Sequence, residues 1–145
     1  MNKVFVTGAC GFIGSNLVDR LLKDGYKVVG WDNRSTGRIE FLNDALNNPN
    51  FTLIEGDNLN VSALSESMIG CDVVFHLAAK IAIDKSEKDL VYKTNVEGTQ
   101  NLIDVSIRKK IKKFIHYSSI HAFDPHPLDE VLDETRAFIG KTKLV

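Results

Sequence analysis

Apolar runs alternate with amphipathic stretches along this chain, and the alternation predicts strands separated by helices. Residues 4–6 read Val-Phe-Val without a polar break, which is typical of a strand buried on both faces. Ile13, Leu17 and Leu21 then share one helical face, and Gly25 is the predicted helix stop. Further apolar runs predict strands at residues 27–31, 51–55, 73–77 and 113–117.

The segments between these strands carry helical patterns with recognisable ends. One helix is predicted through residues 39–46, with a stop at residues 48–50. Asn60 is the predicted cap of the next helix. We expect three apolar residues of that helix to face inward: Leu64, Met68 and Ile69.

A long helix is predicted over residues 87–108, with a weak point at Gly98 because glycine disfavours helix interiors. Beyond Ile120, prolines and acidic residues predict a surface loop. Strands that alternate with helices form parallel βαβ units with right-handed crossovers. The expected fold is therefore α/β, a Rossmann-type doubly wound parallel sheet with strand order 3-2-1-4-5 and helices on both faces.

Three glycines lie between the first strand and its helix, where backbone N–H groups and a positive helix end can meet a pyrophosphate. Gly8 permits the tight turn, Gly11 lets phosphates approach the backbone, and Gly14 lets the helix lie close to the strand. An ordinary turn is the alternative, because the spacing is Gly-x-x-Gly-x-x-Gly. The second strand, however, ends in Asp32, where a carboxylate accepts hydrogen bonds from an adenosine ribose. We therefore predict a dinucleotide site.

Composition bounds the remaining classes. The chain has 145 residues and a net charge of −1, which fits one α/β domain and gives no electrostatic case for nucleic acid or a membrane surface. No apolar stretch has membrane-spanning length, and Met1 leads into the first strand without a signal peptide, so we expect a cytoplasmic protein. Cys10 and Cys71 lie in different turns and predict neither a disulfide nor a metal site.

The chain resembles the extended short-chain dehydrogenase/reductase superfamily, in its NAD-dependent epimerase/dehydratase group. Tyr117-Ser118-Ser119 matches that family loosely, and the five closer motifs are Thr7-Gly-Ala-Cys-Gly-Phe-Ile-Gly14, Asp32-Asn33 with Ser35-Thr-Gly37, Gly56-Asp57, His76-Leu-Ala-Ala79 and Asn95-Val-Glu-Gly-Thr-Gln-Asn-Leu102. The Asp32 loop looks like that of nucleotide-sugar epimerases. Residues 118–123 and 132–136 look more like the dihydroflavonol-reductase-like branch, so the substrate stays open.

The resemblance implies a role for each matching residue. Ser119 would be the catalytic serine that hydrogen-bonds the substrate carbonyl, and Asn95 would support the site from the long helix. The cofactor would be held by Gly8, Gly11, Phe12 and Ile13 at the pyrophosphate, Asp32 and Asn33 at the ribose, Asp57 and Asn58 at the adenine, and Leu77, Ala78 and Ala79 along its middle. Asp32 favours NAD, because its carboxylate would repel the extra phosphate of NADP; Arg34 and Arg38 would soften that repulsion.

The family transfers a hydride to or from nicotinamide while the tyrosine of a Tyr-x-x-x-Lys helix transfers the proton. Tyr26, Tyr92 and Tyr117 are the only tyrosines, and none has lysine at the right offset in the right place. We therefore expect residues 1–145 to be the N-terminal, NAD-binding part of a longer enzyme. It would act on a carbonyl or hydroxyl of a small polar substrate such as a nucleotide sugar. The alternative is a non-catalytic NAD(P)-binding module, regulatory or truncated. The resemblance also implies a homodimer of the full-length form.

Several residues have structural alternatives to a functional role. His76 lies within an apolar strand, and we interpret it as a buried, hydrogen-bonded imidazole, not a ligand. Three side chains in the proline-containing loop could be drawn as a metal cluster, but we predict no metal site there: His121, Asp124 and His126. Cys10 is interpreted as a small residue packed under the phosphate turn.

Overall fold

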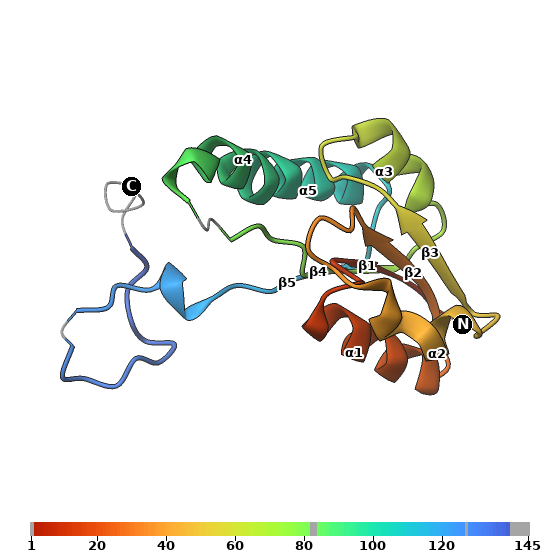
Figure 1. Cartoon of the computed structure of the whole chain (residues 1–145), viewed down its shortest axis with the longest axis horizontal. Helices are drawn as coiled ribbons and strands as arrows, with labels where there is room; N and C mark the ends of the chain where they lie inside the picture. The colour runs from red at the N-terminus through yellow and green to blue at the C-terminus, as the bar shows by residue number, and fades with distance from the viewer. Residues whose placement is uncertain (1, 82–83, 127, 140–145) are drawn as a thin grey trace.

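The computed structural model describes residues 2–81, 84–126 and 128–139. Its centre is a five-stranded sheet in the order β3-β2-β1-β4-β5, with every neighbouring pair parallel (Figure 1). This confirms the predicted fold class and strand order. The strands are β1 (Lys3–Thr7), β2 (Lys27–Asp32), β3 (Phe51–Glu55), β4 (Val73–His76) and β5 (Lys113–His116).

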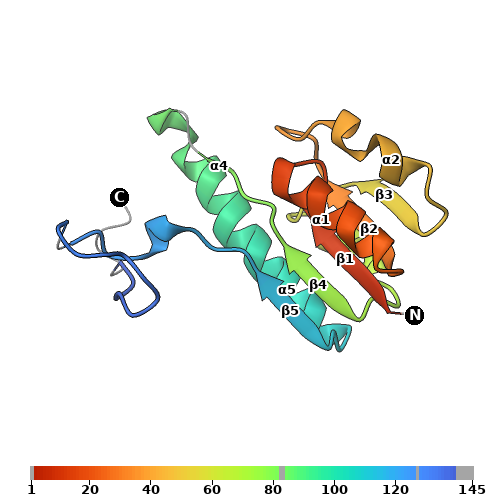
Figure 2. The same ribbon diagram turned by 90° about the horizontal axis from the view of Figure 1, so that it is seen from below.

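Helices cover both faces of the sheet, as predicted. One face carries α1 (Phe12–Lys23), η1 (Ile39–Leu42) and α2 (Asn43–Leu46), and Figure 2 shows α1 lying across β1 and β2. The other face carries α3 (Val61–Ser67), η2 (Lys85–Glu87), α4 (Lys88–Tyr92), η3 (Lys93–Glu97) and α5 (Gly98–Arg108). A short η4 (Ile120–Ala122) follows β5.

Two apolar clusters hold these layers together, because successive strand residues point to opposite faces of the sheet. Val4 and Val6 point toward α1, where Val18 and Leu21 pack against them. On the opposite face, one buried cluster joins β1, β2 and β4 to α3 and α5, and its large members are Phe5, Trp31, Leu64, Met68, Leu102 and Val105. The sheet therefore has an apolar core on each of its two faces.

The helix α3 confirms its predicted cap but corrects one inward residue. Asn60 Oδ1 accepts a hydrogen bond from the Ala63 N–H at 3.2 Å. Leu64 and Met68 are fully buried, whereas Ile69 is 60% exposed. The prediction for Ile69 is wrong because α3 ends at Ser67, so the chain has already left the helical periodicity at Ile69.

The long helix exists, but its irregularity precedes Gly98. Residues Lys93–Glu97 form one π-helical stretch between α4 and α5. Gly98 is buried, and a Cβ there would lie 3.1 Å from the Asn58 Cβ. The glycine therefore allows a close approach between this helix and the loop after β3, and the break itself lies in the turn before it.

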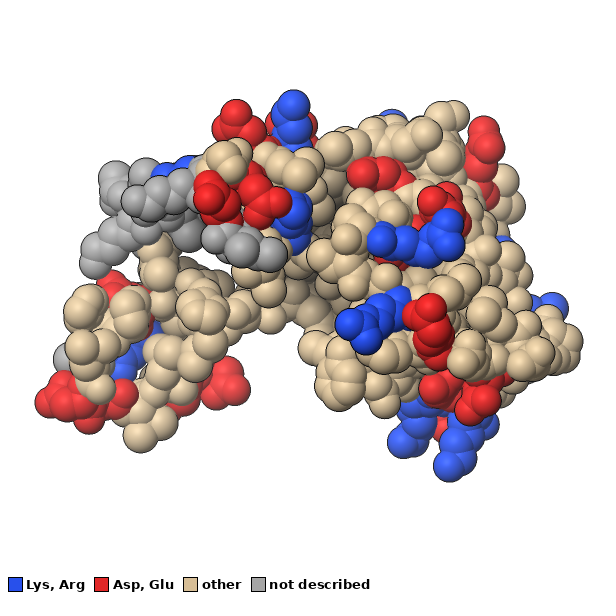
Figure 3. Space-filling view, in the orientation of Figure 1, with Lys and Arg blue, Asp and Glu red and all other residues tan. Residues whose placement is uncertain are grey.

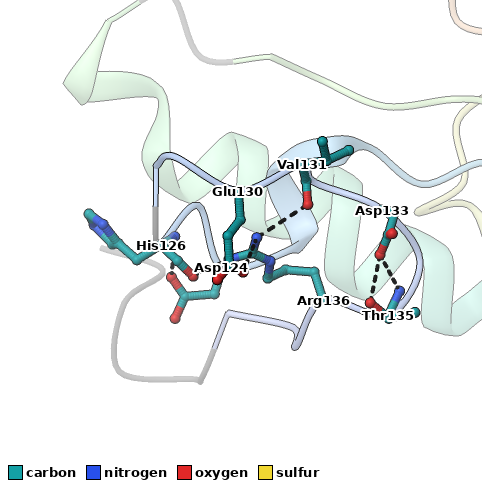
Figure 4. Close-up of polar contacts among 7 residues, drawn as sticks. All are labelled: Asp124, His126, Glu130, Val131, Asp133, Thr135 and Arg136. Atoms are coloured by element: carbon teal, nitrogen blue, oxygen red, sulfur yellow. Dashed lines mark hydrogen bonds and ion pairs between the residues drawn. The ribbon is translucent and has the colours of Figure 1, made fainter.

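Residues 117–126 and 128–139 lie in an arm that extends away from the sheet (Figure 1). Phe123 and Phe138 form an isolated antiparallel bridge, and their rings stack with centroids 5.0 Å apart. Arg136 lies at the centre of this arm, where its guanidinium donates to the backbone carbonyls of His126 and Val131 and pairs with Glu130 (Figure 4). The predicted surface loop is thus an arm with its own internal contacts.

Candidate functional site

A pocket opens at the carboxyl ends of the central strands, between the turn after β1 and the loops after β2, β3 and β4. This is the switch point of the strand order, where doubly wound sheets bind their ligands. Nine of the residues predicted to hold a cofactor line it: Gly8, Gly11, Asp32, Asn33, Asp57, Asn58, Leu77, Ala78 and Ala79. The structure therefore brings together most of the predicted cofactor residues from four separate loops.

Three other predicted cofactor residues do not line the pocket. Phe12 and Ile13 begin α1 with side chains that are 76% and 58% exposed. Gly14 lies beneath the turn, where an added Cβ would be 2.0 Å from the Gly8 carbonyl oxygen. Its absent side chain lets α1 begin directly against the end of β1. Phe12 and Ile13 can contribute backbone N–H groups, because the first N–H groups of a helix have no acceptor within it.

The turn after β1 has the shape of a cradle for an anionic group. Gly8 has φ +69°, and a Cβ on it would lie 2.8 Å from the backbone nitrogen of Ala78. A Cβ on Gly11 would be 3.2 Å from the Gly8 carbonyl oxygen. Side chains have little or no room at these two positions, so the backbone of the turn itself lines the pocket at the N-terminus of a twelve-residue helix, where N–H groups can meet an anion. These residues fit the pyrophosphate of a dinucleotide.

Asp32 is held rigidly at the edge of the pocket. Its side chain is buried, with Oδ2 accepting from the Cys10 N–H at 2.9 Å and Oδ1 accepting from the Arg34 N–H at 2.7 Å. Each carboxylate oxygen keeps a second lone pair for a ligand hydroxyl. Burial, and then the charge of Asp32, raises the pKa of the Cys10 thiol to about 11. Cys10 therefore stays a neutral thiol, and its complete burial in the core cluster agrees with the interpretation that it packs under the turn.

Three further polar residues line the pocket, Asn33 after β2 and Asp57 and Asn58 after β3. Asn33 Nδ2 donates to Asp57 Oδ2 at 3.4 Å, and Asp57 Oδ1 accepts from the Leu59 N–H at 2.9 Å. Asn58 is buried, and its Oδ1 accepts from Trp31 Nε1–H at 2.9 Å. The Asn58 side chain therefore fixes the pocket wall, while the Asp57 carboxylate is exposed toward the ligand space.

Sequence reasoning missed Trp31 as part of this wall. Its ring packs so closely under Gly56 that a Cβ there would lie 2.2 Å from the ring. Gly56 was the available signal, because it directly follows β3, and β3 pairs with the strand that carries Trp31. The other pocket residues without a predicted role are Ser35, Thr36, Gly37, Gly56, Lys80, Leu90 and Thr94.

Thr7 and His76 support the strand end that forms the pocket floor. The Thr7 Oγ1 accepts from the N–H groups of Leu77 and Ala78, both at 3.2 Å, and lies 2.7 Å from His76 Nδ1. With both acceptor positions occupied, the hydroxyl donates its own proton to Nδ1. His76 Nε2 must then carry the ring proton and donate to Thr99 Oγ1 at 2.8 Å. His76 is thus a buried, fully hydrogen-bonded imidazole, as predicted.

The electrostatics of the site agree with an uncharged His76 ring. Burial, and then the nearby His116, lower the pKa of His76 from 6.5 to about 4. The imidazole is therefore neutral at physiological pH. A neutral ring with both nitrogens engaged is a structural part of the floor.

Asn95 reaches the pocket through Lys80. The Lys80 N–H donates to Asn95 Oδ1 at 2.7 Å, and Asn95 Nδ2 donates to the Lys80 carbonyl at 2.8 Å. Lys80 lines the pocket, and its Nζ pairs with Glu87 Oε1 at 2.9 Å. Asn95 therefore holds the loop after β4 with both of its amide atoms, from the π-helical stretch of the long helix.

Ser119 lies outside this pocket. It is exposed at the start of η4, where its Oγ is 3.1 Å from His121 Nδ1 and accepts from the His121 N–H at 3.3 Å. His126 N–H donates to Asp124 Oδ1 at 3.0 Å in a separate turn. Across the described residues, no three His, Cys, Asp or Glu side chains gather in a metal-binding group. Within those same residues, no helix has the length and hydrophobicity to cross a bilayer.

Comparison of the chain with known proteins identifies the family that it matches. The profile of the NAD dependent epimerase/dehydratase family matches residues 4–141. UDP-glucose 4-epimerase of Mycolicibacterium smegmatis is 41% identical over 122 residues, which cover 81% of this chain and 38% of that protein. The chain thus spans about two fifths of the length of this relative.

Solved structures give the same picture. The UDP-N-acetylglucosamine 4-epimerase from Methanobrevibacter ruminantium, solved with UDP-N-acetylmuramic acid, matches with TM-score 0.85 and 34% identity over 97% of this chain and 44% of its own. WbmH of Bordetella bronchiseptica, solved with NAD+, matches with TM-score 0.80 and 32% identity over 94% of this chain and 45% of its own.

Proposed function

The chain belongs to the NAD-dependent epimerase/dehydratase family, and on that premise we propose that it is the NAD-binding part of a nucleotide-sugar oxidoreductase. The reaction would move a hydride between the nicotinamide and a hydroxyl or carbonyl of the sugar. NAD is the cofactor of this family, and relatives of this chain have been solved with NAD bound. The chain itself would supply the dinucleotide pocket.

One observation carries this proposal: a glycine cradle at the start of α1 faces a fixed carboxylate at the end of β2 within one pocket. The first feature fits a pyrophosphate and the second fits the ribose hydroxyls of the adenosine. When bound there, NAD would supply the hydride acceptor or donor. Gly8 and Gly11 would admit the phosphates, and Asp32 would orient the ribose.

The loop after β4 would position the middle of the cofactor. Thr7 holds the N–H groups of Leu77 and Ala78, and Asn95 holds Lys80. Leu77, Ala78 and Ala79 present small or apolar groups on this side of the pocket. We therefore assign Asn95 as a positioning residue that acts through Lys80, and these loop residues as the surface against which the cofactor lies.

The substrate side of the proposal rests on the relatives. UDP-glucose 4-epimerase and UDP-N-acetylglucosamine 4-epimerase both act at C4 of a nucleotide sugar, so we propose a nucleotide sugar as substrate class. Ser119 would hydrogen-bond its carbonyl or hydroxyl oxygen. The proton-transferring Tyr-x-x-x-Lys would come from sequence beyond residues 1–145, consistent with a chain that covers about two fifths of each relative.

A calorimetric titration of the chain with NAD tests the cofactor site. Gly11→Val should retain the far-UV circular dichroism of the wild type, because the substituted Cβ meets only the Gly8 carbonyl oxygen at 3.2 Å. Its NAD affinity should fall by about tenfold or more, because the side chain occupies space that the phosphates need. Ser62→Val is the control, since Ser62 is exposed on α3 and does not line the pocket. Unchanged NAD affinity in Gly11→Val would remove the basis of the proposal.

A non-catalytic NAD-binding module is the second candidate function, and the position of Ser119 outside the pocket supports it. Ser119 stands on the arm and hydrogen-bonds His121, and it does not line the described pocket. The coding sequence after residue 145 discriminates the two candidates. A Tyr-x-x-x-Lys within about ten codons supports the enzyme, because connecting loops of this kind are short. The full-length product should then epimerise a UDP-sugar, and Ser119→Ala should lower that rate.

A further inference from the structure

A second hollow borders the cofactor pocket at the ends of β2 and β3. It shares Asn33 and Gly37 with the pocket, and four charged side chains line it: Arg34, Arg38, Glu40 and Glu55. Figure 3 shows basic and acidic side chains next to one another on the side of the molecule where β2 and β3 lie. The hollow continues from the Asp32 end of the pocket. Its charged side chains would therefore lie close to any substituent on a ribose bound at Asp32.

Arg34 is held by two contacts that point in different directions. Its backbone lies in the left-handed region, with φ +53°, and its N–H donates to Asp32 Oδ1 at 2.7 Å. Its guanidinium instead reaches β3, where Nη2 donates to the Glu55 carboxylate. Asp32 and Glu55 are register partners across β2 and β3. Glu55 thus draws the Arg34 side chain away from the carboxylate that its own backbone caps.

This pairing matters for a ribose that bears a 2′-phosphate. A phosphate placed there would meet the negative charge of Asp32, and an arginine is the side chain best suited to offset it, since its planar fork binds phosphate with two hydrogen bonds. The Arg34 backbone lies beside Asp32, next to the position such a phosphate would take. Its guanidinium, however, is already paired with Glu55. The second carboxylate also adds to the negative potential beside the ribose.

We propose that Glu55 determines cofactor specificity by engaging the Arg34 guanidinium, which keeps that cation from a ribose 2′-phosphate and preserves the preference for NAD over NADP. The inference rests on the proposed orientation of the ribose at Asp32. A role in stability is the weaker reading of the same pair. The Arg34 and Glu55 side chains are 45% and 60% exposed, and exposed ion pairs contribute little to folding.

Binding of reduced cofactors to the 145-residue chain tests the proposal. Trp31 is the only tryptophan and lines the pocket, so energy transfer from its indole to bound NADH or NADPH gives both dissociation constants. Four proteins are compared with the wild type: Glu55→Gln, Arg34→Ala, the double variant, and Glu40→Gln. The last removes the same charge from the same hollow, and Glu40 has no ion pair with Arg34 among the described contacts.

Glu55→Gln should bind NADPH about fivefold more tightly than the wild type does, the change that one well-placed exposed charge pair supports, and keep NADH within about twofold. The double variant should lose that gain because no guanidinium remains to be released. Glu40→Gln should show no comparable gain. The gain in Glu55→Gln should also shrink with added salt, because the contact is exposed.

Three results would overturn the proposal: no NADPH gain in Glu55→Gln, a gain that persists in the double variant, or an equal gain in Glu40→Gln. The second would point to Arg38, and the third to a general effect of net charge. If the wild type binds no NADH, the cofactor site itself is wrong and this inference fails with it. If NADH binds and only the NADPH comparison fails, the cofactor site stands.

Discussion

Single atoms decide how closely the first helix approaches the first strand. A Cβ on Gly14 would lie 2.0 Å from the Gly8 carbonyl oxygen and 3.0 Å from the Ala9 Cα. Both obstacles are backbone atoms of the turn, which cannot move without displacing the helix or the pocket. Gly14 therefore acts on the site through geometry, without touching a ligand.

Gly14→Ala should destabilise the chain by about 3 kcal/mol or more, because overpacking against backbone cannot be relieved by a side-chain rotation. Gly70→Ala is the matched control. Its φ is +73° and nothing lies within 4 Å of the added Cβ, so only left-handed strain of about 1 kcal/mol applies. Urea unfolding followed by circular dichroism measures both. Equal losses in the two variants would contradict the close-approach argument.

His76 makes stability depend on pH in a defined window. Its pKa is lowered from 6.5 to about 4 in the folded chain. Between these values the unfolded chain takes up a proton that the folded chain does not, so stability falls as pH falls from 6.5 toward 4 and is not lowered further by this group below that range. The loss attributable to His76 should reach about 3 kcal/mol.

The measurement is the unfolding free energy from urea titrations between pH 4 and 7.5, in the wild type and in His76→Gln. Carboxylates also titrate near the lower limit, so the informative quantity is the difference in slope between the two proteins. The wild type should show the steeper slope. Parallel curves would mean that His76 does not carry a depressed pKa.

Residue identities predicted the pocket better than they predicted individual roles. Gly8, Gly11 and Asp32 come together because a βαβ unit brings the ends of parallel strands to one edge. Asn58 lines the same pocket, but its Oδ1 accepts from Trp31, a contact between β2 and the loop after β3 that no local pattern reveals. Ser119 falls on an arm whose course depends on the Phe123–Phe138 bridge, a pairing set by tertiary contact.

At the scale of elements, the long helix is interrupted by a π-helical stretch and contributes Leu90 and Thr94 to the pocket. Strands could be predicted because buried parallel strands are continuous apolar runs. The π-helical stretch at Lys93–Glu97 could not, because it depends on contacts distant in sequence. Asn95 must meet Lys80, and Gly98 must meet Asn58, within one stretch of helix. Such stretches occur frequently at functional sites.

Asn95→Ala should cost about 1–3 kcal/mol of unfolding free energy, because it leaves a backbone donor and acceptor of Lys80 without their partner. It should also weaken NAD binding, since Lys80 lines the pocket. Gln100→Ala is the control on the same helix. Gln100 makes an exposed hydrogen bond to Asp104, and its loss should change stability by less than about 0.5 kcal/mol. Equal NAD affinities in the two variants would argue against a positioning role for Asn95.

At the scale of the whole molecule, the two edges of the sheet differ. Among the described strands, β3 pairs only with β2 and β5 only with β4, but α2 packs against β3. Phe114 packs against the core, but Ile115 points to the opposite face and is only half-buried. An uncapped strand edge next to apolar side chains is a template for pairing with another chain.

The 145-residue chain should therefore self-associate as its concentration rises, as measured by size-exclusion chromatography and sedimentation velocity. Ile115→Lys should shift the population toward monomer, because a lysine at a strand edge opposes pairing. Leu46→Lys on α2 is the control: Leu46 is 46% exposed, and α2 packs beside β3 at the opposite end of the sheet, so association should be unchanged. A wild type that stays monomeric at high concentration would show that the β5 edge is not used.

The π-helical stretch also sets the rotational phase of the helix that contains it. One extra residue per turn offsets the two halves by roughly 100°, the angle that a residue occupies in a regular α-helix. Thr94 and Leu90 thereby face the pocket while Leu102 and Val105 face the core. Deleting a single residue between 93 and 97 would restore uniform winding and swing the upstream half away from the ligand. The exact number of residues in this stretch therefore matters to the site, although regular α-helix lies on both sides of it.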